Sequence, residues 1–258
     1  MSTRPLRTRA PALNRAAAAS VATAVLVALV ALTGCAPDGA DGPDTSSATS
    51  SGTGPVASAI AEPAVLVESG VGVIAEGCSM VASLGSGVVV ERSGQVATAA
   101  HTVRGASILT VVDAGGQEHL ASVTSFDKDS DLALLDVPTL TAPPLGIGTA
   151  RVGPATLITW RRSDGVTQQI VGVTRLLKIN IEDIYADEVV QRTGLEVDGD
   201  VIVGQSGGPV VDASGEVIGI IYATSKDRDA VGFATDHTEL RELIEARSAG
   251  GVANGQCP

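Results

Sequence analysis

From about residue 64 the chain alternates short runs of Val, Ile and Leu with turns rich in Gly, Ser and Asp. Such runs, separated by such turns, are typical of β-strands joined by hairpins. The clearest pairs of runs flank residues 92–95, 114–116, 163–165 and 213–215. Only residues 238–246 have helical spacing, and Thr235 or Asp236 is the expected N-cap. The sequence therefore predicts an all-β fold with one short C-terminal helix.

The composition limits what this chain can bind. With 258 residues, 44% of them hydrophobic and 18% charged, the chain can form a sizeable core. The formal net charge is −12, and it becomes −16 without residues 1–34, which hold four arginines and no acid. Aromatic residues make up only 2%, too few to form a platform on which bases stack. A polyanion would be repelled, so we expect no nucleic-acid partner.

The start of the chain has the organisation of a secretory signal. Arginines precede an apolar run over residues 16–33, which closes with small residues before Cys35. The sequence Leu32-Thr33-Gly34-Cys35 resembles the lipobox of bacterial lipoproteins, in which the cysteine is acylated. We therefore expect a lipoprotein signal peptide over 1–34 and a lipid anchor at Cys35; a transmembrane anchor is the alternative. Both place the rest of the chain in the cell envelope, on the outer side of the cytoplasmic membrane.

A low-complexity segment follows the expected anchor. Of the 25 residues from 36 to 60, 23 are Ala, Pro, Asp, Gly, Ser or Thr. Such a segment buries too little apolar surface to offset the entropy of ordering it. We expect a flexible linker over residues 35–63 and a folded domain over 64–258.

Two further cysteines lie in the folded part of the chain, Cys78 near its beginning and Cys257 at its end. In an oxidising compartment an even pair of cysteines favours a disulfide. Two unpaired thiols are the alternative.

Three segments carry residue types suited to nucleophilic catalysis. His101 lies in TAAHTV, Asp131 in DSDLALL and Ser206 in GQSGGP. A serine hydroxyl needs a neighbouring base to become a nucleophile, and an imidazole oriented by a buried carboxylate is such a base. We therefore predict a catalytic triad of these three residues, with Asp127 and Asp129 as alternatives to Asp131. The backbone amides of Gly204 and Ser206 are the expected oxyanion hole.

These motifs, in the order His, Asp, Ser, resemble those of the trypsin-like serine peptidases of the chymotrypsin fold. The segments GSGVVV, ATAAHTV, SFDKDSDLALLDV, GQSGGPVVDASGEVIGI and VGFAT are similar to the HtrA/Deg peptidases of bacterial envelopes. The resemblance implies two antiparallel six-stranded β-barrels, over about 70–140 and about 150–234, and a helix over about 236–247. It also implies a serine endopeptidase that cleaves envelope proteins through an acyl-enzyme, with protein or peptide substrates and without a metal or organic cofactor.

The sequence departs from the family pattern in two places. HtrA-type chains usually carry a PDZ domain, but only 52 residues follow Ser206, so we expect none here. Gln205 stands where digestive trypsin-like enzymes have an aspartate that pairs with the freed N-terminus. Because a sequence does not show the geometry of an oxyanion hole, a catalytically silent protease-fold lipoprotein, acting as a binding or signalling module, is the alternative function.

The sequence gives little information about the substrate pocket. By resemblance, Ile221, Tyr222 and Ala223 form a wall of the pocket for the residue before the cleaved bond. Asp200 lies where trypsin-branch enzymes carry the acid that selects Arg or Lys, but we expect it on a solvated acidic loop with Glu196 and Asp198. We also expect His119 and His237 to be solvated, and three scattered histidines predict no zinc site.

Overall fold

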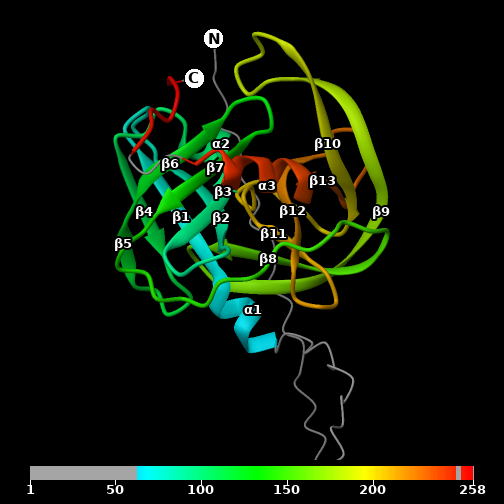
Figure 1. Cartoon of the computed structure of the whole chain (residues 1–258), viewed down its shortest axis with the longest axis horizontal. Coiled ribbons are helices and arrows are strands. Elements are labelled where there is room, and N and C mark those ends of the chain that lie inside the picture. The colour runs from blue at the N-terminus through cyan, green and yellow to red at the C-terminus, as the bar shows by residue number, and fades with distance from the viewer. Residues whose placement is uncertain (1–62, 248–250, 258) are drawn as a thin grey trace, which may run out of the picture. The chain divides into compact units, whose positions relative to one another are not determined.

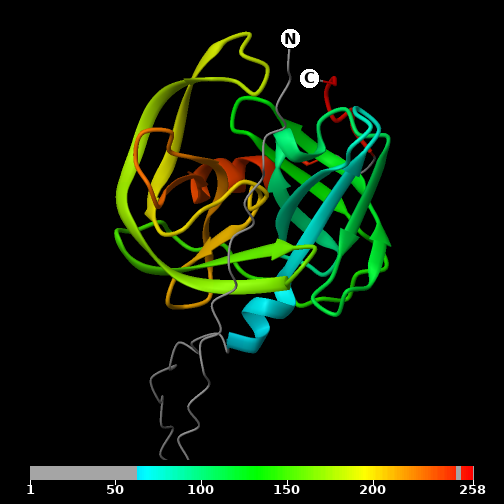
Figure 2. The ribbon, with the colours of Figure 1, turned by 180° about the vertical axis from the view of Figure 1, so that it is seen from behind.

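The computed structural model describes residues 63–247 and 251–257, and these residues form two antiparallel β-sheets that lie side by side (Figures 1 and 2). The first sheet has the order β5-β4-β1-β2-β3-β7-β6. Its strands are β1 (Gly70–Glu76), β2 (Ser83–Val89), β3 (Gln95–Ala99), β4 (Ile108–Val112), β5 (Glu118–Leu120), β6 (Ser122–Asp127) and β7 (Leu132–Asp136). The second sheet is a closed barrel in the order β10-β13-β12-β11-β8-β9. Its strands are β8 (Gly153–Arg161), β9 (Gly165–Glu182), β10 (Val189–Asp198), β11 (Pro209–Val211), β12 (Val217–Thr224) and β13 (Val231–Asp236).

The first sheet curls round on itself. Its two edge strands, β5 and β6, are consecutive in the chain and are separated by Ala121 alone. The amide of Ala121 donates to the carbonyl of Leu109, so the chain leaves one edge of the sheet and joins the other within one residue. The predicted all-β class with two antiparallel sheets is confirmed. The first sheet has seven strands rather than six because this bend divides one expected strand into two.

Each sheet encloses its own apolar core, and a third apolar cluster joins the two sheets. That third cluster combines Val88 and Leu134 of the first sheet with Ile158 and Ile220 of the barrel, and Leu240 packs among them. All five side chains are essentially inaccessible to solvent. Because burying one such side chain contributes about 1.5–3 kcal/mol, the interface holds the two sheets in a fixed relation.

The C-terminal helix α3 (His237–Glu245) supplies Leu240 and Leu243 to that cluster and lies across both sheets in Figure 1. Asp236 is its N-cap, since its carboxylate accepts from the amide of Thr238 at 2.9 Å. The other expected cap, Thr235, is buried and donates instead to the carbonyl of Ser130.

Two shorter helices were not predicted. They are α1 (Pro63–Ser69) and α2 (Ala100–Val103). Over the ranges that the structure describes, no helix has the length and apolar character needed to cross a membrane. The expected signal peptide, the anchor at Cys35 and most of the linker lie outside the described residues.

The hairpin of β9 and β10 is much longer than the sequence pattern indicates. The strand expected after the turn at residues 163–165 extends as β9 to Glu182, and Glu196 and Asp198, which were expected on an acidic loop, lie on β10. In the outer part of β9, from Leu177 to Glu182, polar residues alternate with apolar ones, so this part lacks the continuous apolar run of a fully buried strand. The turn between the two strands reaches the first sheet, where Lys128 Nζ lies 2.6 Å from Asp183 Oδ2 and Arg104 donates to the carbonyl of Ile184.

The end of the chain returns to the first sheet. Cys78 and Cys257 form a disulfide, with 5.3 Å between their Cα atoms. The expected disulfide is therefore present, and the alternative of two unpaired thiols is wrong. Asn254 Nδ2 donates to the carbonyls of Val103, the last residue of α2, and of Ala106, just after that helix. The tail therefore braces the segment that follows His101.

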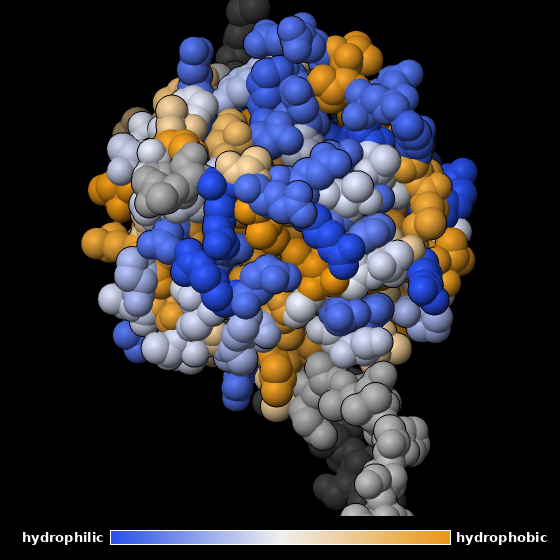
Figure 3. Space-filling view, in the orientation of Figure 1, coloured by the Kyte–Doolittle hydropathy of each residue, from blue (hydrophilic) through white to orange (hydrophobic). Residues whose placement is uncertain are grey.

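The face of the molecule seen in Figure 1 is mostly hydrophilic, with apolar residues gathered in a strip down its middle (Figure 3). Aromatic residues make up only 2% of the chain. The buried core is therefore built mainly from aliphatic side chains.

Candidate active site

His101 and Asp131 are brought together by the pairing of two strands. β3 ends at Ala99 and β7 begins at Leu132, and these two residues lie opposite each other in the antiparallel ladder. The residues just beyond that end of the ladder must therefore lie close together. His101 Nδ1 is 2.8 Å from Asp131 Oδ2, and the backbone amide of His101 donates to Asp131 Oδ1 at 2.9 Å. The carboxylate thus fixes both the ring and the backbone of the histidine.

Asp131 is held in an unusual conformation. Its side chain is only 6% exposed, and its φ of 58° lies in the left-handed region that non-glycine residues rarely adopt. Its carbonyl accepts from the amide of Ala100 at 3.0 Å. The two alternative candidates for the catalytic acid make other contacts. Asp127 accepts hydrogen bonds from Ser130 Oγ and from the amide of Asp129. Asp129 forms an ion pair with Lys128. Of these three acids, Asp131 is the one that contacts His101.

The loop that carries Ser206 is fixed against both sheets. The amide of Ser86 on β2 donates to the carbonyl of Ser206 at 2.7 Å. On the barrel side, the amide of Gly207 donates to the carbonyl of Ile221 at 2.7 Å, and the Ile221 amide donates to Gly208. A Cβ added at Gly85 would lie 2.9 Å from the Ser206 carbonyl and 3.0 Å from Thr102 Oγ1. Ser206 is therefore a neighbour of α2, the helix that contains His101.

The reactive groups of the loop are unengaged. Among the described residues, Ser206 Oγ makes no hydrogen bond to His101, and the amides of Gly204 and Ser206 donate to no protein atom. Gly204 has a φ of 93°, and nothing lies within 4 Å of where its Cβ would be. Catalytic hydrogen bonds are often long without substrate and tighten in the complex. Two free amides beside an open position are what an oxyanion hole requires.

Gln205 fixes the loop of Ser206 to strand β8. Its side chain is buried, and Oε1 accepts from the amide of Ile202 at 2.9 Å while Nε2 donates to Thr159 Oγ1 at 3.3 Å. An uncharged amide therefore ties this loop to β8, at the position where the sequence analysis noted the missing aspartate. No freed N-terminus is needed for that contact.

Two residues that the sequence analysis did not connect lie behind Asp131. Arg192 on β10 is buried, donates through Nε to the carbonyl of Asp129 at 2.9 Å, and stacks over the ring of Tyr222 at 4.9 Å. Burial raises the pKa of Tyr222 above its ordinary value. Arg192 therefore joins the loop before Asp131 to Tyr222 on β12. A lone arginine in a strand gives no local signal of such a role.

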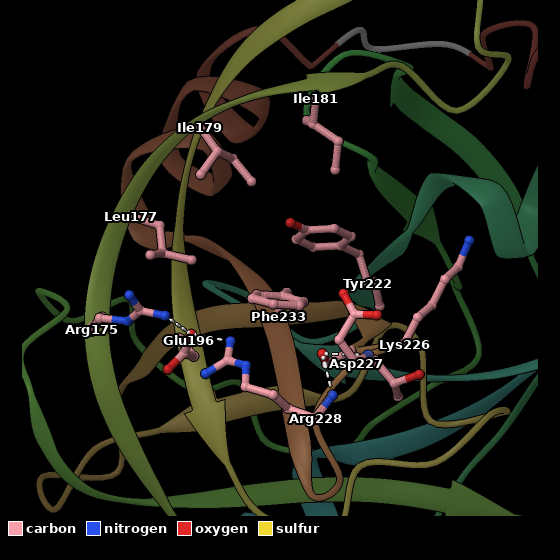
Figure 4. Close-up of a pocket in the computed structure, with 13 residues that line it drawn as sticks. Arg175, Leu177, Ile179, Ile181, Glu196, Tyr222, Lys226, Asp227, Arg228 and Phe233 are labelled. Atoms are coloured by element: carbon pink, nitrogen blue, oxygen red, sulfur yellow. Dashed lines mark hydrogen bonds and ion pairs between the residues drawn. The ribbon is translucent and has the colours of Figure 1, made fainter.

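The expected pocket residues lie on β12 but differ in exposure. Ile221 is buried in the barrel core, whereas Tyr222 and Ala223 line a cavity of about 600 Å³ (Figure 4). Asp200 is exposed and does not line this cavity. The expectation for Glu196 was wrong, because it is buried on β10 rather than solvated on a loop. Arg228 and Arg175 both donate to its carboxylate and hold its pKa well below the ordinary value.

The expectation of solvated histidines was also wrong for His119. Its side chain is 4% exposed, and its ring contacts Thr139 Oγ1 at 2.8 Å and Asp113 Oδ2 at 3.3 Å. It is the inward-facing residue of the three-residue strand β5, a pattern too short to recognise in the sequence. His237 is half-buried and accepts from the amide of Ala150 through Nδ1.

One group of acids in the described ranges has the spacing of a cation site, namely Asp129, Asp183 and Glu188. The ammonium of Lys128 already lies among them, 2.9 Å from Asp129 and 2.6 Å from Asp183. These hydrogen bonds raise the pKa of Lys128, and the one from Lys128 lowers the pKa of Asp183 to about 2. The cluster is an ion-pair network that joins the hairpin turn to the loop of Asp131.

Residues 85–220, just over half of the chain, match the family model described as a trypsin-like peptidase domain. The chain therefore belongs to the trypsin-like peptidase family. Its similar curated relatives are HtrA/Do-like and related serine proteases. Serine protease Rv3671c of Mycobacterium tuberculosis is 32% identical over an alignment of 178 residues, and the match covers 67% of this chain and 44% of that protein. Serine protease Do-like HtrA of Lactococcus lactis is 29% identical over an alignment of 189 residues, and the match covers 66% of this chain and 46% of that protein.

Solved structures agree with that assignment. The crystal structure of the active form of the Rv3671c protease has a TM-score of 0.69 and 28% identity, and the match covers 75% of this chain and 87% of that one. The HtrA-type protease AlgW, solved with a tripeptide, has a TM-score of 0.60 and 26% identity, covering 71% and 62% of the two chains. The chain spans less than half the length of the curated relatives named above.

Proposed function

We propose that this protein is a serine endopeptidase that cleaves peptide bonds with Ser206 as nucleophile, His101 as general base and Asp131 as the acid that orients the base. The observation that carries the proposal is the 2.8 Å contact between His101 Nδ1 and Asp131 Oδ2, formed beside the loop that bears Ser206. Membership of the trypsin-like peptidase family supports it.

The mechanism follows from the chemistry of the three groups. His101 Nε2 takes the proton of Ser206 as Oγ attacks the substrate carbonyl carbon. When the tetrahedral intermediate collapses, the same nitrogen gives that proton to the departing amine, and an acyl-enzyme remains. A water molecule, deprotonated in the same way, then releases the acid and restores the serine. Asp131 keeps Nδ1 protonated throughout and stabilises the imidazolium that forms in both halves.

The oxyanion of each tetrahedral intermediate is assigned to the amides of Gly204 and Ser206. They are free of protein partners among the described residues, so no internal bond has to break before they can donate. One such donor contributes about 3–4 kcal/mol to transition-state stabilisation. The side chain of Gln205 stabilises the conformation of this loop through its hydrogen bonds with the amide of Ile202 and the hydroxyl of Thr159.

For the place of action we propose the cell envelope, with the domain on the outer side of the cytoplasmic membrane and Cys35 as the lipid anchor. Its substrates would then be envelope proteins or their peptides. The support is the signal-like sequence of residues 1–35 and the linker that follows it. The disulfide between Cys78 and Cys257 suits an oxidising compartment. Metabolic labelling with a fatty-acid analogue tests the anchor: the wild type should take up label and Cys35→Ala should not.

Cleavage of an unfolded protein such as reduced casein tests the enzymatic proposal. Wild type should cleave it, and Ser206→Ala should not, while both unfold at the same temperature. If the two proteins release peptides equally, Ser206 is not the nucleophile. If neither cleaves and a cellular phenotype of gene loss is rescued by Ser206→Ala, the binding or signalling module is the better account.

A further inference from the structure

We propose that Arg192 is a positioning residue of the active site, whose buried positive charge acts through Asp131 to weaken the basicity of His101. This inference rests on the proposed function and adds one residue to the groups that control the base. Arg192 lies on β10, in the other sheet from His101, and belongs to none of the motifs that carry the triad.

The first observation is that the guanidinium of Arg192 is buried without a partner of opposite charge. The residue is only 3% exposed. Its Nε and Nη2 both donate to the uncharged carbonyl of Asp129, at 2.9 and 2.5 Å, and it stacks over the ring of Tyr222. Among the described residues no carboxylate forms an ion pair with it, and that of Asp129 pairs with Lys128 instead. Burying an unpaired charge is costly, so charges farther away must help to compensate it.

The second observation places a buried negative charge nearby. Asp129, whose carbonyl Arg192 holds, is two residues before Asp131. Burial is the largest influence on the pKa of Tyr222 and raises it, while the charge of Arg192 lowers that pKa and the charge of Asp131 raises it. The guanidinium and the carboxylate therefore lie near the same phenol. The side chain of Asp131 is 6% exposed, so the interior screens the two charges from each other much less than water would.

The third observation is that the loop of Asp131 is held at three successive backbone carbonyls. The donors to the carbonyls of residues 129, 130 and 131 are Arg192 on β10, Thr235 on β13 and the amide of Ala100 in α2. Asp131 has a φ of 58°, a conformation that persists in a non-glycine residue only when its surroundings hold it. Arg192 therefore fixes the start of the turn that aims the carboxylate at His101.

The other ionisable groups around His101 are exposed or paired elsewhere. The helix of His101, α2, packs against β1, β2, β3 and β7, and of these β2 and β3 carry no ionisable side chain. The groups on the remaining elements and on the neighbouring loops are Glu76, Arg104, Asp127, Lys128, Asp129, Asp136 and Asp200. Glu76 and Asp200 are exposed, Asp136 pairs with Arg92, and Arg104 donates to the carbonyl of Ile184. Asp127 accepts from Ser130, and Lys128 pairs with Asp129 and Asp183.

The sign of the effect follows from the two buried charges. The carboxylate of Asp131 favours the imidazolium form of His101, and the positive charge of Arg192 opposes it. A protonated His101 cannot take the proton of Ser206. Without the positive charge, His101 should gain its proton at a higher pH, and the acidic limb of kcat/KM should move up by about half a pH unit or more. A purely structural role predicts the opposite direction, because a displaced carboxylate would favour the imidazolium less.

The experiment measures the pH dependence of kcat/KM for the full-length chain on one peptide. Arg192→Gln keeps a donor for the carbonyl of Asp129 but loses the charge, so its acidic limb should move up. Arg192→Met, which fills a similar volume without a charge, is the second uncharged variant and should show the same shift. Arg192→Lys keeps the charge, so its limb should stay in place even where kcat falls. Arg161→Gln, which removes a charge from an exposed ion pair elsewhere on the barrel, should also leave the limb in place.

An NMR titration of the imidazole signals in a Ser206→Ala background reads the same effect without turnover. The signal of His101 is identified by its loss in His101→Gln, and His119 and His237 are internal controls. We expect the midpoint of His101 alone to move up when Arg192→Gln is added. A midpoint and a limb that stay or move down in the folded uncharged variants would overturn this inference alone. A wild type that does not cleave would overturn the proposed function, while the titration still decides whether the charge of Arg192 reaches His101.

Discussion

The backbone amide of Ser86 on β2 donates a 2.7 Å hydrogen bond to the carbonyl oxygen of Ser206, and this bond ties the loop of Ser206 to the sheet that carries His101. Ser86 holds two more segments in place. Its carbonyl accepts from Thr98 Oγ1 at 2.7 Å, and its hydroxyl accepts from the amide of Trp160 at 2.9 Å. One small residue therefore sets the spacing between the serine loop, β3 and β8.

Gly207→Ala should abolish cleavage and destabilise the fold, because the new Cβ would lie 2.0 Å from the Ser86 carbonyl oxygen. The residue also has a φ of 87°, which alone costs a non-glycine residue about 1–2 kcal/mol. Gly116→Ala is the matched control, with a φ of 84° but nothing within 4 Å of its Cβ position. Thermal unfolding and casein cleavage should show both losses for Gly207→Ala and only the smaller destabilisation for Gly116→Ala. Equal behaviour of the two variants would show that the contact with Ser86 is unimportant.

Asp131→Asn should lower kcat by about 10⁴-fold while the protein still folds. The amide cannot stabilise an imidazolium, and it no longer holds Nδ1 in the protonated form that leaves Nε2 free to act as the base. Asp129→Asn is the control, since that carboxylate pairs with Lys128 and does not contact His101. Steady-state kinetics on one peptide checks the prediction. Similar losses in the two variants would mean that the carboxylates act together on the loop rather than through the histidine.

Removing the disulfide should destabilise the domain. The bond joins residues separated by 179 positions, and in the chain-entropy model such a closure contributes up to about 5 kcal/mol. Cys257→Ser should lower the free energy of unfolding in denaturant and expose residues 251–257 to added protease. A reducing agent should reproduce the effect in wild type and add nothing in Cys257→Ser. Unchanged unfolding in the variant would show that the tail contacts of Asn254 hold without the bond.

Asp183→Asn should destabilise the hairpin at neutral pH but not in strong acid. The Lys128 ammonium lowers the pKa of Asp183 to about 2, below the ordinary value of 3.8. When folding lowers the pKa of a carboxyl group, its ionised form stabilises the fold at pH values above the pKa of the unfolded state. That stabilisation is lost as the pH falls through the pKa of the folded state. The difference in unfolding free energy between wild type and variant should therefore be constant above about pH 5 and shrink from about pH 4 to pH 2. A difference that persists undiminished at pH 2 would contradict the role of the charge.

The sequence predicted those features that depend on local pattern. Short apolar runs and glycine-rich turns indicated the strands around residues 92–95 and 213–215, and the spacing of the last helix was recognisable. The motifs around His101, Asp131 and Ser206 were found because the three occur together, in the order His, Asp, Ser that the trypsin-like peptidases share. The pairing of Cys78 with Cys257 followed from their number and the expected compartment.

Features that depend on contacts between distant segments were not predictable in this way. The outer half of β9 is stabilised by the reach of its turn to Lys128 and Arg104, which no local pattern encodes. Glu196 looked like a loop acid because its partners, Arg175 and Arg228, lie 21 and 32 residues away in the chain. Arg192 likewise gains its role only when β10 comes to lie behind the loop of Asp131.

The central claim is that Ser206 is an activated nucleophile, and labelling with a fluorophosphonate followed by peptide mapping tests it most directly. We predict a single adduct on Ser206 in the folded wild type, and a much slower reaction in Asp131→Asn at equal folding. A folded protein whose Ser206 stays unmodified, or one in which His101→Ala reacts as fast as wild type, would contradict it.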